Sequence, residues 1–182
     1  MAGLKLITFA DGAGSRAGVL LDGGRVLDLG AAMPPARDMI SLIEAGPAAL
    51  AAVRALAANP PAAAVLPLAA VALQAPIPRP RRNVFCVGRN YMDHVAEGDR
   101  TRGITTSEVP KFPQFFTKAP DCVVAPGALV PSHAGVTKWL DYEVELVAII
   151  GTAGRDIAKD KALDHVFGWT IGNDVTGRDL QR

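Results

Sequence analysis

Short β-branched runs separated by glycine and proline make up most of the chain after residue 82. The runs are NVFCVG (83–88), DCVVAPG (121–127), VELVAIIG (144–151) and FGWTIG (167–172). β-Branched and aromatic residues favour strands, while glycine and proline interrupt regular structure, so these runs predict strands joined by tight turns. We therefore expect strands and turns to dominate this part of the chain.

The first part of the chain has a different pattern. KLITFA, SRAGVLLD and RVLDL predict three short strands, with a turn at Gly23-Gly24 before the third. Two helices are then predicted over 37–45 and 47–58, because both stretches are rich in strong helix formers. Pro60-Pro61 ends the second helical pattern.

A compositional boundary follows these elements. Residues 76–82 alternate proline with arginine and are typical of an extended connector. We predict three segments: a small N-terminal domain of a hairpin and two helices (1–75), a Pro/Arg linker (76–82) and a second domain (83–182).

Charge and composition exclude several functional classes. The net charge of +1 argues against nucleic acid or an anionic membrane as the main partner. The uncharged stretch 55–78 is long enough to span a membrane, but its five prolines would break such a helix, so we predict no span. Cys86 and Cys122 form no C-x-x-C pair, and the N-terminus lacks the apolar region of a signal peptide. We therefore predict a cytoplasmic protein without a disulfide framework.

The strongest local signal is WLDYEVELVAIIG, residues 139–151. Side chains alternate along a strand, so Asp141, Glu143 and Glu145 are predicted on one face and the apolar residues between them on the other, and the VAII run suggests that the strand enters a core. Neighbouring carboxylates repel unless they face water or surround a cation. A hard divalent ion (Mg²⁺, Mn²⁺ or Ca²⁺) and a solvated acidic edge strand both remain open.

A second cluster is GRNYMDHVAEGD, residues 88–99. A helix of one to two turns is predicted over 92–97, closed by Gly98, which makes His94 and Glu97 neighbours on one face. A carboxylate beside an imidazole raises its basicity, as in a general base that activates water. A surface ion pair is the alternative interpretation.

The third cluster is GWTIGNDVTGRDLQR, residues 168–182. A helix after Asn173 would place Asp174, Arg178 and Gln181 on one face. Arg178 could then anchor an acidic substrate beside a cation held by Asp174. An ordinary Asp174–Arg178 helix salt bridge is the alternative.

Taken in order, NVFCVGRNYMDHVAE, FFTKAPDCVVAPG, DYEVELVAIIG and GWTIGNDVTGRDLQR resemble the successive motifs of the fumarylacetoacetate hydrolase family. The resemblance runs from about residue 82 to the last residue, and the first 75 residues resemble the small N-terminal domain of many bacterial members. It implies an α+β, mainly β fold: an incomplete mixed β-sandwich roll preceded by a small α+β domain. It also implies a homodimer, a site for Mg²⁺ or Mn²⁺ and a small-molecule 2-oxo acid or dicarbonyl substrate.

The resemblance assigns a role to each candidate residue. It implies metal ligands at Glu143, Glu145 and Asp174, a base dyad of His94 and Glu97, substrate contacts from Arg178 and Gln181, a site-lining Lys118 and a mobile lid over 98–109.

The implied activity is metal-dependent hydrolysis of a carbon–carbon bond in acylpyruvate-like 2,4-dioxo acids. His94, oriented by Glu97, would take a proton from water, and the resulting hydroxide would attack the distal carbonyl. Relatives that share the enolate chemistry are isomerases or decarboxylases of 2-oxo diacids, and this alternative stays open. An inactive metal-binding remnant is the third possibility.

Two departures from the family pattern affect this interpretation. Residues 87–90 carry no acidic ligand before the predicted His94 helix, which makes the chain similar to a three-carboxylate bacterial branch. Family members also continue well beyond the position of Arg182, with a further lysine, a Gly- and Thr-containing loop and several strands. We therefore keep three interpretations open: a fragment, a truncated gene product, or half of a site completed elsewhere.

Overall fold

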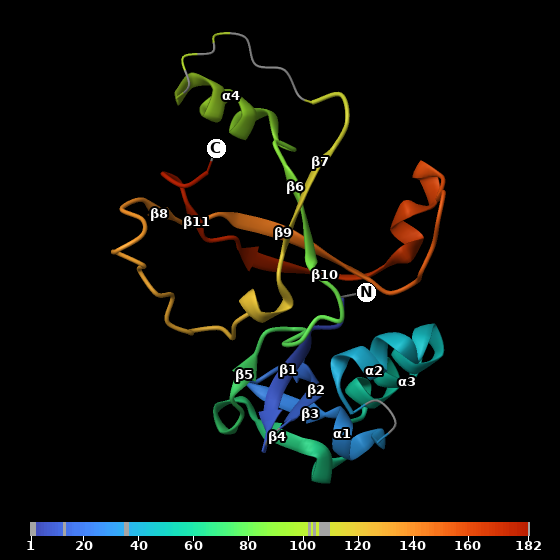
Figure 1. Cartoon of the computed structure of the whole chain (residues 1–182). Helices are drawn as coiled ribbons and strands as arrows, with labels where there is room; N and C mark the ends of the chain where they lie inside the picture. The colour runs from blue at the N-terminus through green and yellow to red at the C-terminus, as the bar shows by residue number, and fades with distance from the viewer. Residues whose placement is uncertain are drawn as a thin grey trace. The chain divides into compact units, whose positions relative to one another are not determined.

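The computed structural model describes residues 3–12, 14–34, 37–101, 103, 105 and 110–181 (Figure 1), without the side chains at positions 94, 97, 99 and 101. Contacts divide the chain into two compact units. One unit combines Met1–Ile77 with Ala125–Arg182, and the other is Pro78–Val124. The domain boundary at 76–82 stays a prediction.

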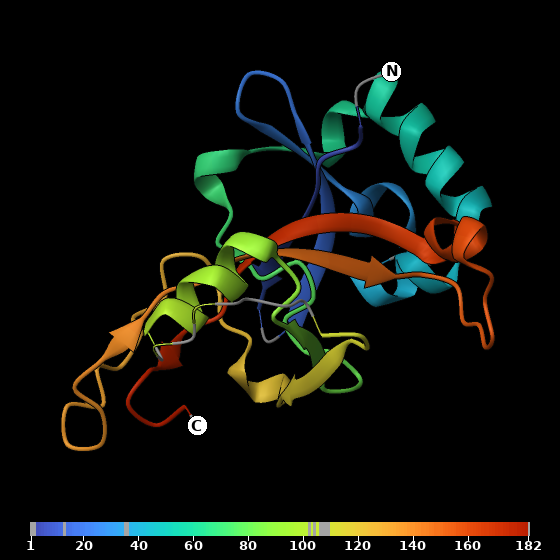
Figure 2. The same cartoon turned by 90° about the horizontal axis from the view of Figure 1, so that it is seen from above.

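Short strands outnumber helices in the described part of the chain (Figures 1 and 2). The strands of the first unit are β1 (Leu6–Asp11), β2 (Gly14–Leu21), β3 (Arg25–Asp28), β4 (Val65–Pro67), β5 (Leu73–Gln74), β8 (Leu140–Asp141), β9 (Val144–Ile150), β10 (Val166–Asn173) and β11 (Thr176–Gly177). Its helices are α1 (Leu29–Ala32), α2 (Met39–Glu44) and α3 (Gly46–Ala58), with 3₁₀ turns at Ala62–Ala64, Leu68–Ala70 and Lys159–His165. The second unit contains β6 (Val84–Gly88), α4 (Met92–Thr101), β7 (Gln114–Lys118) and a 3₁₀ turn at Pro120–Cys122.

The N-terminal strands form one antiparallel sheet in the order β4-β3-β2-β1-β5. The β2–β3 turn uses Gly23 and Gly24, whose φ angles of 71° and 67° lie in the left-handed region that favours glycine. Gly12, at φ 55°, serves the β1–β2 turn in the same way. The predicted strands and hairpin turn are thus confirmed.

Helices α2 and α3 confirm both predicted helices. Asp38 caps α2 by accepting a 2.8 Å hydrogen bond from the Ser41 amide. Helix α3 ends at Ala58, two residues before Pro60-Pro61. Sheet and helices share one buried apolar core, formed by Ala17, Val19, Leu27, Leu29, Met39, Leu42, Val53 and Ala64. Burial of this core is the main stabilising contribution to the N-terminal fold.

Strands β9 and β10 form a separate antiparallel pair, with Leu146 opposite Ile171 and Glu145 opposite Gly172. The predicted alternation is present: Glu145 is half-buried, whereas Leu146 is 61% exposed. The expectation that the VAII run enters a core is wrong, because Val147 and Ile149 are only half-buried and Ile150 is 61% exposed.

The second unit is built on the antiparallel β6–β7 pair. Helix α4 continues through Gly98 to Thr101, so the predicted closure at Gly98 is wrong. The strand predicted over 121–127 is also wrong: a 3₁₀ turn ends at Cys122 and irregular backbone follows, since prolines at 120 and 126 cannot donate to a strand ladder. Half of the positions of the predicted 98–109 lid lie outside the described residues.

Within the described ranges, none of the helices combines the length and apolar character needed to cross a membrane.

Candidate active site

The C-terminal strand β11 forms a short antiparallel ladder with β8, which directly precedes Glu143 and Glu145 in the sequence. Strand β11 pairs with β8, with Thr176 opposite Asp141 and Gly177 opposite Leu140. The Arg178 amide extends this contact by donating a 2.8 Å hydrogen bond to the Trp139 carbonyl. The helix predicted after Asn173 is therefore wrong: the backbone groups of this segment pair with a distant strand, and Gly177 has low helix propensity.

Asp179 connects the turn after β11 to residues 137 and 138 through hydrogen bonds. Its carboxylate accepts a hydrogen bond from the Thr137 hydroxyl and a 3.0 Å hydrogen bond from the Lys138 amide. The Lys138 amide is the largest of the influences that hold the pKa of Asp179 below its ordinary value of 3.8, and the Thr137 hydroxyl adds to it. Both hydrogen bonds favour the ionised carboxylate.

Replacement of Asp179 by asparagine should destabilise the protein in a pH-dependent way. Because the folded pKa is lowered, the contribution of Asp179 is fully present above 3.8 and is lost as the pH falls through the folded pKa. Urea unfolding should therefore show a less stable Asp179→Asn variant at pH 7 and a smaller difference from wild type in acid. A difference that does not change with pH would contradict the assignment.

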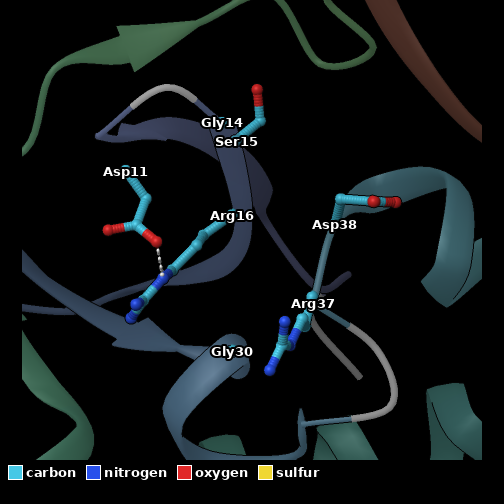
Figure 3. A pocket seen from close by; sticks show the side chains of 7 residues that line it. All are labelled: Asp11, Gly14, Ser15, Arg16, Gly30, Arg37 and Asp38. Atoms are coloured by element: carbon cyan, nitrogen blue, oxygen red, sulfur yellow. Dashed lines mark hydrogen bonds and ion pairs between the residues drawn. The ribbon is translucent and has the colours of Figure 1, made fainter.

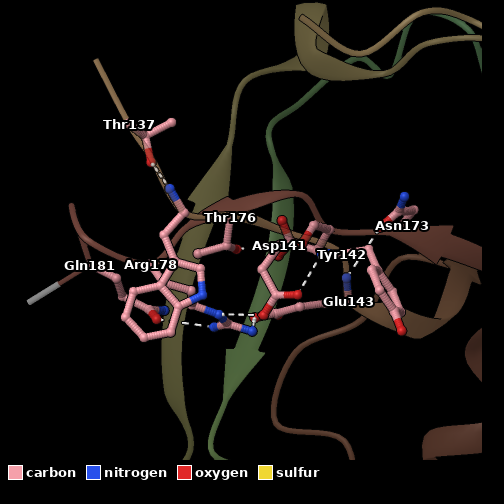
Figure 4. Close-up of polar contacts among 10 residues, drawn as sticks. Thr137, Asp141, Tyr142, Glu143, Asn173, Thr176, Arg178 and Gln181 are labelled. Carbon is pink, nitrogen blue, oxygen red and sulfur yellow. Dashed lines mark hydrogen bonds and ion pairs between the residues drawn. The ribbon is translucent and has the colours of Figure 1, made fainter. Parts of the chain in front are cut away.

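Arg178 is the centre of the polar cluster (Figure 4). Its Nε donates to Asp141 Oδ2 at 2.9 Å, Nη2 pairs with Glu143 Oε1, and Nη1 donates to Gln181 Oε1 at 3.1 Å. The side chains of Arg178, Asp141 and Glu143 are 22%, 37% and 18% exposed, respectively. The cluster is thus partly shielded from solvent screening.

Electrostatics keep this guanidinium charged. Burial by itself would lower the pKa of Arg178, but the hydrogen bond that it donates to Asp141 and the negative charges of Glu143 and Asp141 raise it above its ordinary value. All three guanidinium nitrogens have protein partners, and the cluster holds a fixed positive charge.

Arg178 and Gln181 are in contact, although a turn and not a helix produces this contact, and the predicted convergence of Asp174 with them stays a prediction. Sequence reasoning missed Asp141 as a partner of Arg178. The available signal was its position on the same face as Glu143, two residues along the strand. Nothing local in the sequence pointed to the contact between Asp179 and Thr137.

The three predicted metal ligands come from adjoining strand ends. The Asp174 amide donates a 2.8 Å hydrogen bond to the Glu143 carbonyl, and Glu145 lies opposite Gly172 in the β9–β10 register. The Glu143 amide donates to Asn173 Oδ1 at 3.2 Å, which strengthens the same junction. The backbone therefore brings Glu143, Glu145 and Asp174 to one end of the strand pair.

The donor chemistry of these carboxylates fits a hard divalent cation, because all the ligand atoms are oxygens. Among the residues whose side chains are described, no three histidine, cysteine or acidic side chains are gathered as a ready metal site. Glu143 Oε1 is paired with Arg178 instead, so a cation that binds this oxygen would have to displace the guanidinium. The ligand set stays a prediction.

The remaining candidates belong to the second unit. Positions 94 and 97 lie one turn apart on α4, as predicted, but the side chains of His94 and Glu97 are outside the described residues. Lys118 is the last residue of β7, where it pairs with Val84 and is half-buried. The base dyad and the site-lining lysine therefore stay predictions.

A separate hollow of about 430 Å³ lies beside the N-terminal sheet (Figure 3). Its lining residues are Asp11, Gly14, Ser15, Arg16, Gly30, Arg37 and Asp38. Arg16 contacts Asp11 at 2.6 Å and the buried Asp28 at 2.5 Å, and the hydrogen bond to Asp28 contributes most to raising its pKa. These contacts join strands β1, β2 and β3, which is a structural role.

A family model described as the C-terminal part of fumarylacetoacetate (FAA) hydrolase matches residues 83–182. Oxaloacetate tautomerase YisK of Bacillus subtilis (strain 168) is 48% identical over 115 residues, covering 63% of this chain and 36% of that protein. The chain thus spans only part of this relative's length.

Two solved structures share the fold. A fumarylacetoacetate hydrolase from Exiguobacterium antarcticum is 37% identical, with a TM-score of 0.72, and the match covers 98% of this chain and 58% of that one. Maleylpyruvate hydrolase from Sphingobium sp. SYK-6, in complex with manganese(II) and pyruvate, is 26% identical, with a TM-score of 0.69 and coverages of 96% and 59%. The predicted mixed, mainly β fold is confirmed by this agreement, and the chain belongs to the fumarylacetoacetate hydrolase family.

Proposed function

We propose that this protein carries part of a metal-dependent site that converts a 2-oxo acid to its enol form, with the tautomerisation of oxaloacetate as its activity. The observation that carries the proposal is the cluster of Arg178, Asp141 and Glu143, with Glu145 and Asp174 at the same strand end. It combines a cationic anchor for a carboxylate substrate with oxygen ligands for a cation. The identity to an oxaloacetate tautomerase supports this choice of substrate.

Glu143, Glu145 and Asp174 would hold Mg²⁺ or Mn²⁺. When bound, such an ion supplies positive charge that stabilises an enolate oxygen. The manganese complex of the maleylpyruvate hydrolase supports the choice of these ions.

The chain's own residues would position the substrate and move its proton. Arg178 and Gln181 would bind a substrate carboxylate, and Lys118 would line the site. His94, oriented by Glu97, would take the proton from the carbon between the ketone and the distal carboxylate, and a proton would return to the ketone oxygen. The enol therefore has the same atoms as the ketone, because tautomerisation moves one proton from carbon to oxygen and breaks no carbon–carbon bond.

Hydrolysis of acylpyruvates is the second candidate, and the fold similarity to maleylpyruvate hydrolase favours it. In that reaction the same histidine would take its proton from water, and the hydroxide would attack the distal carbonyl. The two reactions differ in the group that gives up the proton.

Parallel assays separate these candidates. The full chain, with Mg²⁺, with Mn²⁺ or with a chelator, is mixed with oxaloacetate while the ultraviolet absorbance of the enol is followed, and in parallel with an acylpyruvate while loss of the diketo absorbance is followed. We expect metal-dependent acceleration of the oxaloacetate equilibration. Metal-dependent loss of the acylpyruvate alone would favour the hydrolase, and manganese binding without either activity would favour the inactive remnant. Equal rates with metal and chelator would contradict both activities.

The homodimer and the cytoplasmic location remain part of this proposal. Analytical ultracentrifugation of the full chain tests the first, and fractionation of the source cells tests the second.

A further inference from the structure

Arg178 forms an ion pair with Glu143, one of the carboxylates proposed to bind the cation. Its Nη2 is paired with Glu143 Oε1 in a contact that is partly shielded from solvent. A cation and a guanidinium cannot share one carboxylate oxygen favourably, because both are positive and close charges of like sign repel. Binding of the cation through Oε1 therefore separates Arg178 from Glu143.

Asp141 provides a second carboxylate partner for Arg178. Asp141 holds Arg178 through a different nitrogen, Nε, at 2.9 Å. Its other oxygen, Oδ1, accepts a 2.9 Å hydrogen bond from the Tyr142 amide, which orients the carboxylate. Figure 4 shows Asp141 and Glu143 meeting the same guanidinium.

The backbone also holds Asp141 and Arg178 together independently of Glu143. Strand β8 pairs with β11 next to both residues, and the Arg178 amide donates to the Trp139 carbonyl. When Glu143 turns away, Arg178 therefore keeps one carboxylate partner. A half-buried guanidinium without any partner would be much less favourable.

We propose that Asp141 is a positioning residue: it retains Arg178 when Glu143 turns to the cation, so that Arg178 acts as a displaceable counter-ion of Glu143. The inference rests on the proposed function, since it needs Glu143 as a metal ligand. Without Asp141, the guanidinium would keep the neutral Gln181 oxygen but only one of its two carboxylate partners described here, Glu143, and would compete more strongly with the cation.

Manganese titration followed by electron paramagnetic resonance tests this without any turnover assay. Wild type, Asp141→Asn, Arg178→Gln and the double variant are titrated with Mn²⁺. We expect Asp141→Asn to weaken binding about 10-fold, at the lower end of the effect of residues that orient metal ligands. Arg178→Gln should tighten binding several-fold because it removes the competing cation. In the Arg178→Gln background, Asp141→Asn should have almost no further effect, because Asp141 acts through Arg178.

Two controls separate positioning from simple loss of charge. Asp141→Glu keeps the carboxylate and should restore most of the affinity. Asp156→Asn removes one negative charge from a side chain that is 91% exposed, and it should leave the affinity unchanged. Circular dichroism melting of each variant shows that it is folded.

The titration distinguishes failure of the proposed metal site from failure of the proposed role of Asp141. Absence of Mn²⁺ binding by folded wild type would overturn the metal site and the inference together. If wild type binds Mn²⁺ but Asp141→Asn has the same effect with and without Arg178, the role of Asp141 is purely electrostatic and the positioning inference is wrong. An unchanged affinity in Asp141→Asn would also overturn it.

Discussion

Replacement of Glu145 by glutamine should weaken Mn²⁺ binding by at least about 100-fold, since even residues that only orient a ligand cost 10–100-fold. Glutamine keeps the size of the side chain but removes the negative charge that a hard cation prefers. Turnover of the 2-oxo acid should fall in parallel, because the charge that stabilises the enolate is lost. Calorimetric titration of the full chain with Mn²⁺ measures the first effect, and the enol absorbance measures the second.

Asp160→Asn is the matched control, since it removes one acidic charge from an exposed residue of the 159–165 turn. It should leave both affinity and turnover close to wild type. An affinity of Glu145→Gln within twofold of wild type would show that Glu145 is not a ligand, even if the chain binds Mn²⁺ through other residues.

Replacement of His94 by alanine should lower kcat by about 100- to 10,000-fold, the usual contribution of a positioned general base. Mn²⁺ affinity should stay within about twofold of wild type, because His94 takes part in proton transfer and is not a proposed ligand. Rates measured at saturating Mn²⁺ give the comparison.

Glu97→Gln tests the second member of the proposed dyad. It should reduce kcat less than His94→Ala does, because the imidazole remains and only its orientation and basicity change. Loss of Mn²⁺ binding in either variant would contradict the assignment of these residues as a dyad. Full activity of His94→Ala would show that another group takes the proton.

Features that depend on neighbouring residues could be predicted from the sequence. The β2–β3 turn required Gly23 and Gly24 with positive φ. The alternation of side chains along β9 placed Glu145 and Leu146 on opposite faces of the strand. Helices α2 and α3 followed from helix-forming residues with a proline stop. These predictions succeed because turn conformation, strand alternation and helix formation are decided within a few residues.

The helix predicted after Asn173 failed for the opposite reason. Its spacing placed Asp174, Arg178 and Gln181 on one helical face, but pairing of β11 with β8 provides the backbone partners of that segment. A weak local preference, reduced further by Gly177, does not outweigh a ladder with a distant strand. Arg178 and Gln181 still meet, through a turn.

The sequence alone determined the family, the residue types available for chemistry and the face of the strand on which the carboxylates lie. Only the tertiary structure decided that Arg178 pairs with Asp141, 37 positions earlier in the chain, and also with Glu143. The physical reason is that strand alternation is a local property of the backbone, whereas the partner of a charged side chain depends on which distant strands pair and in which register.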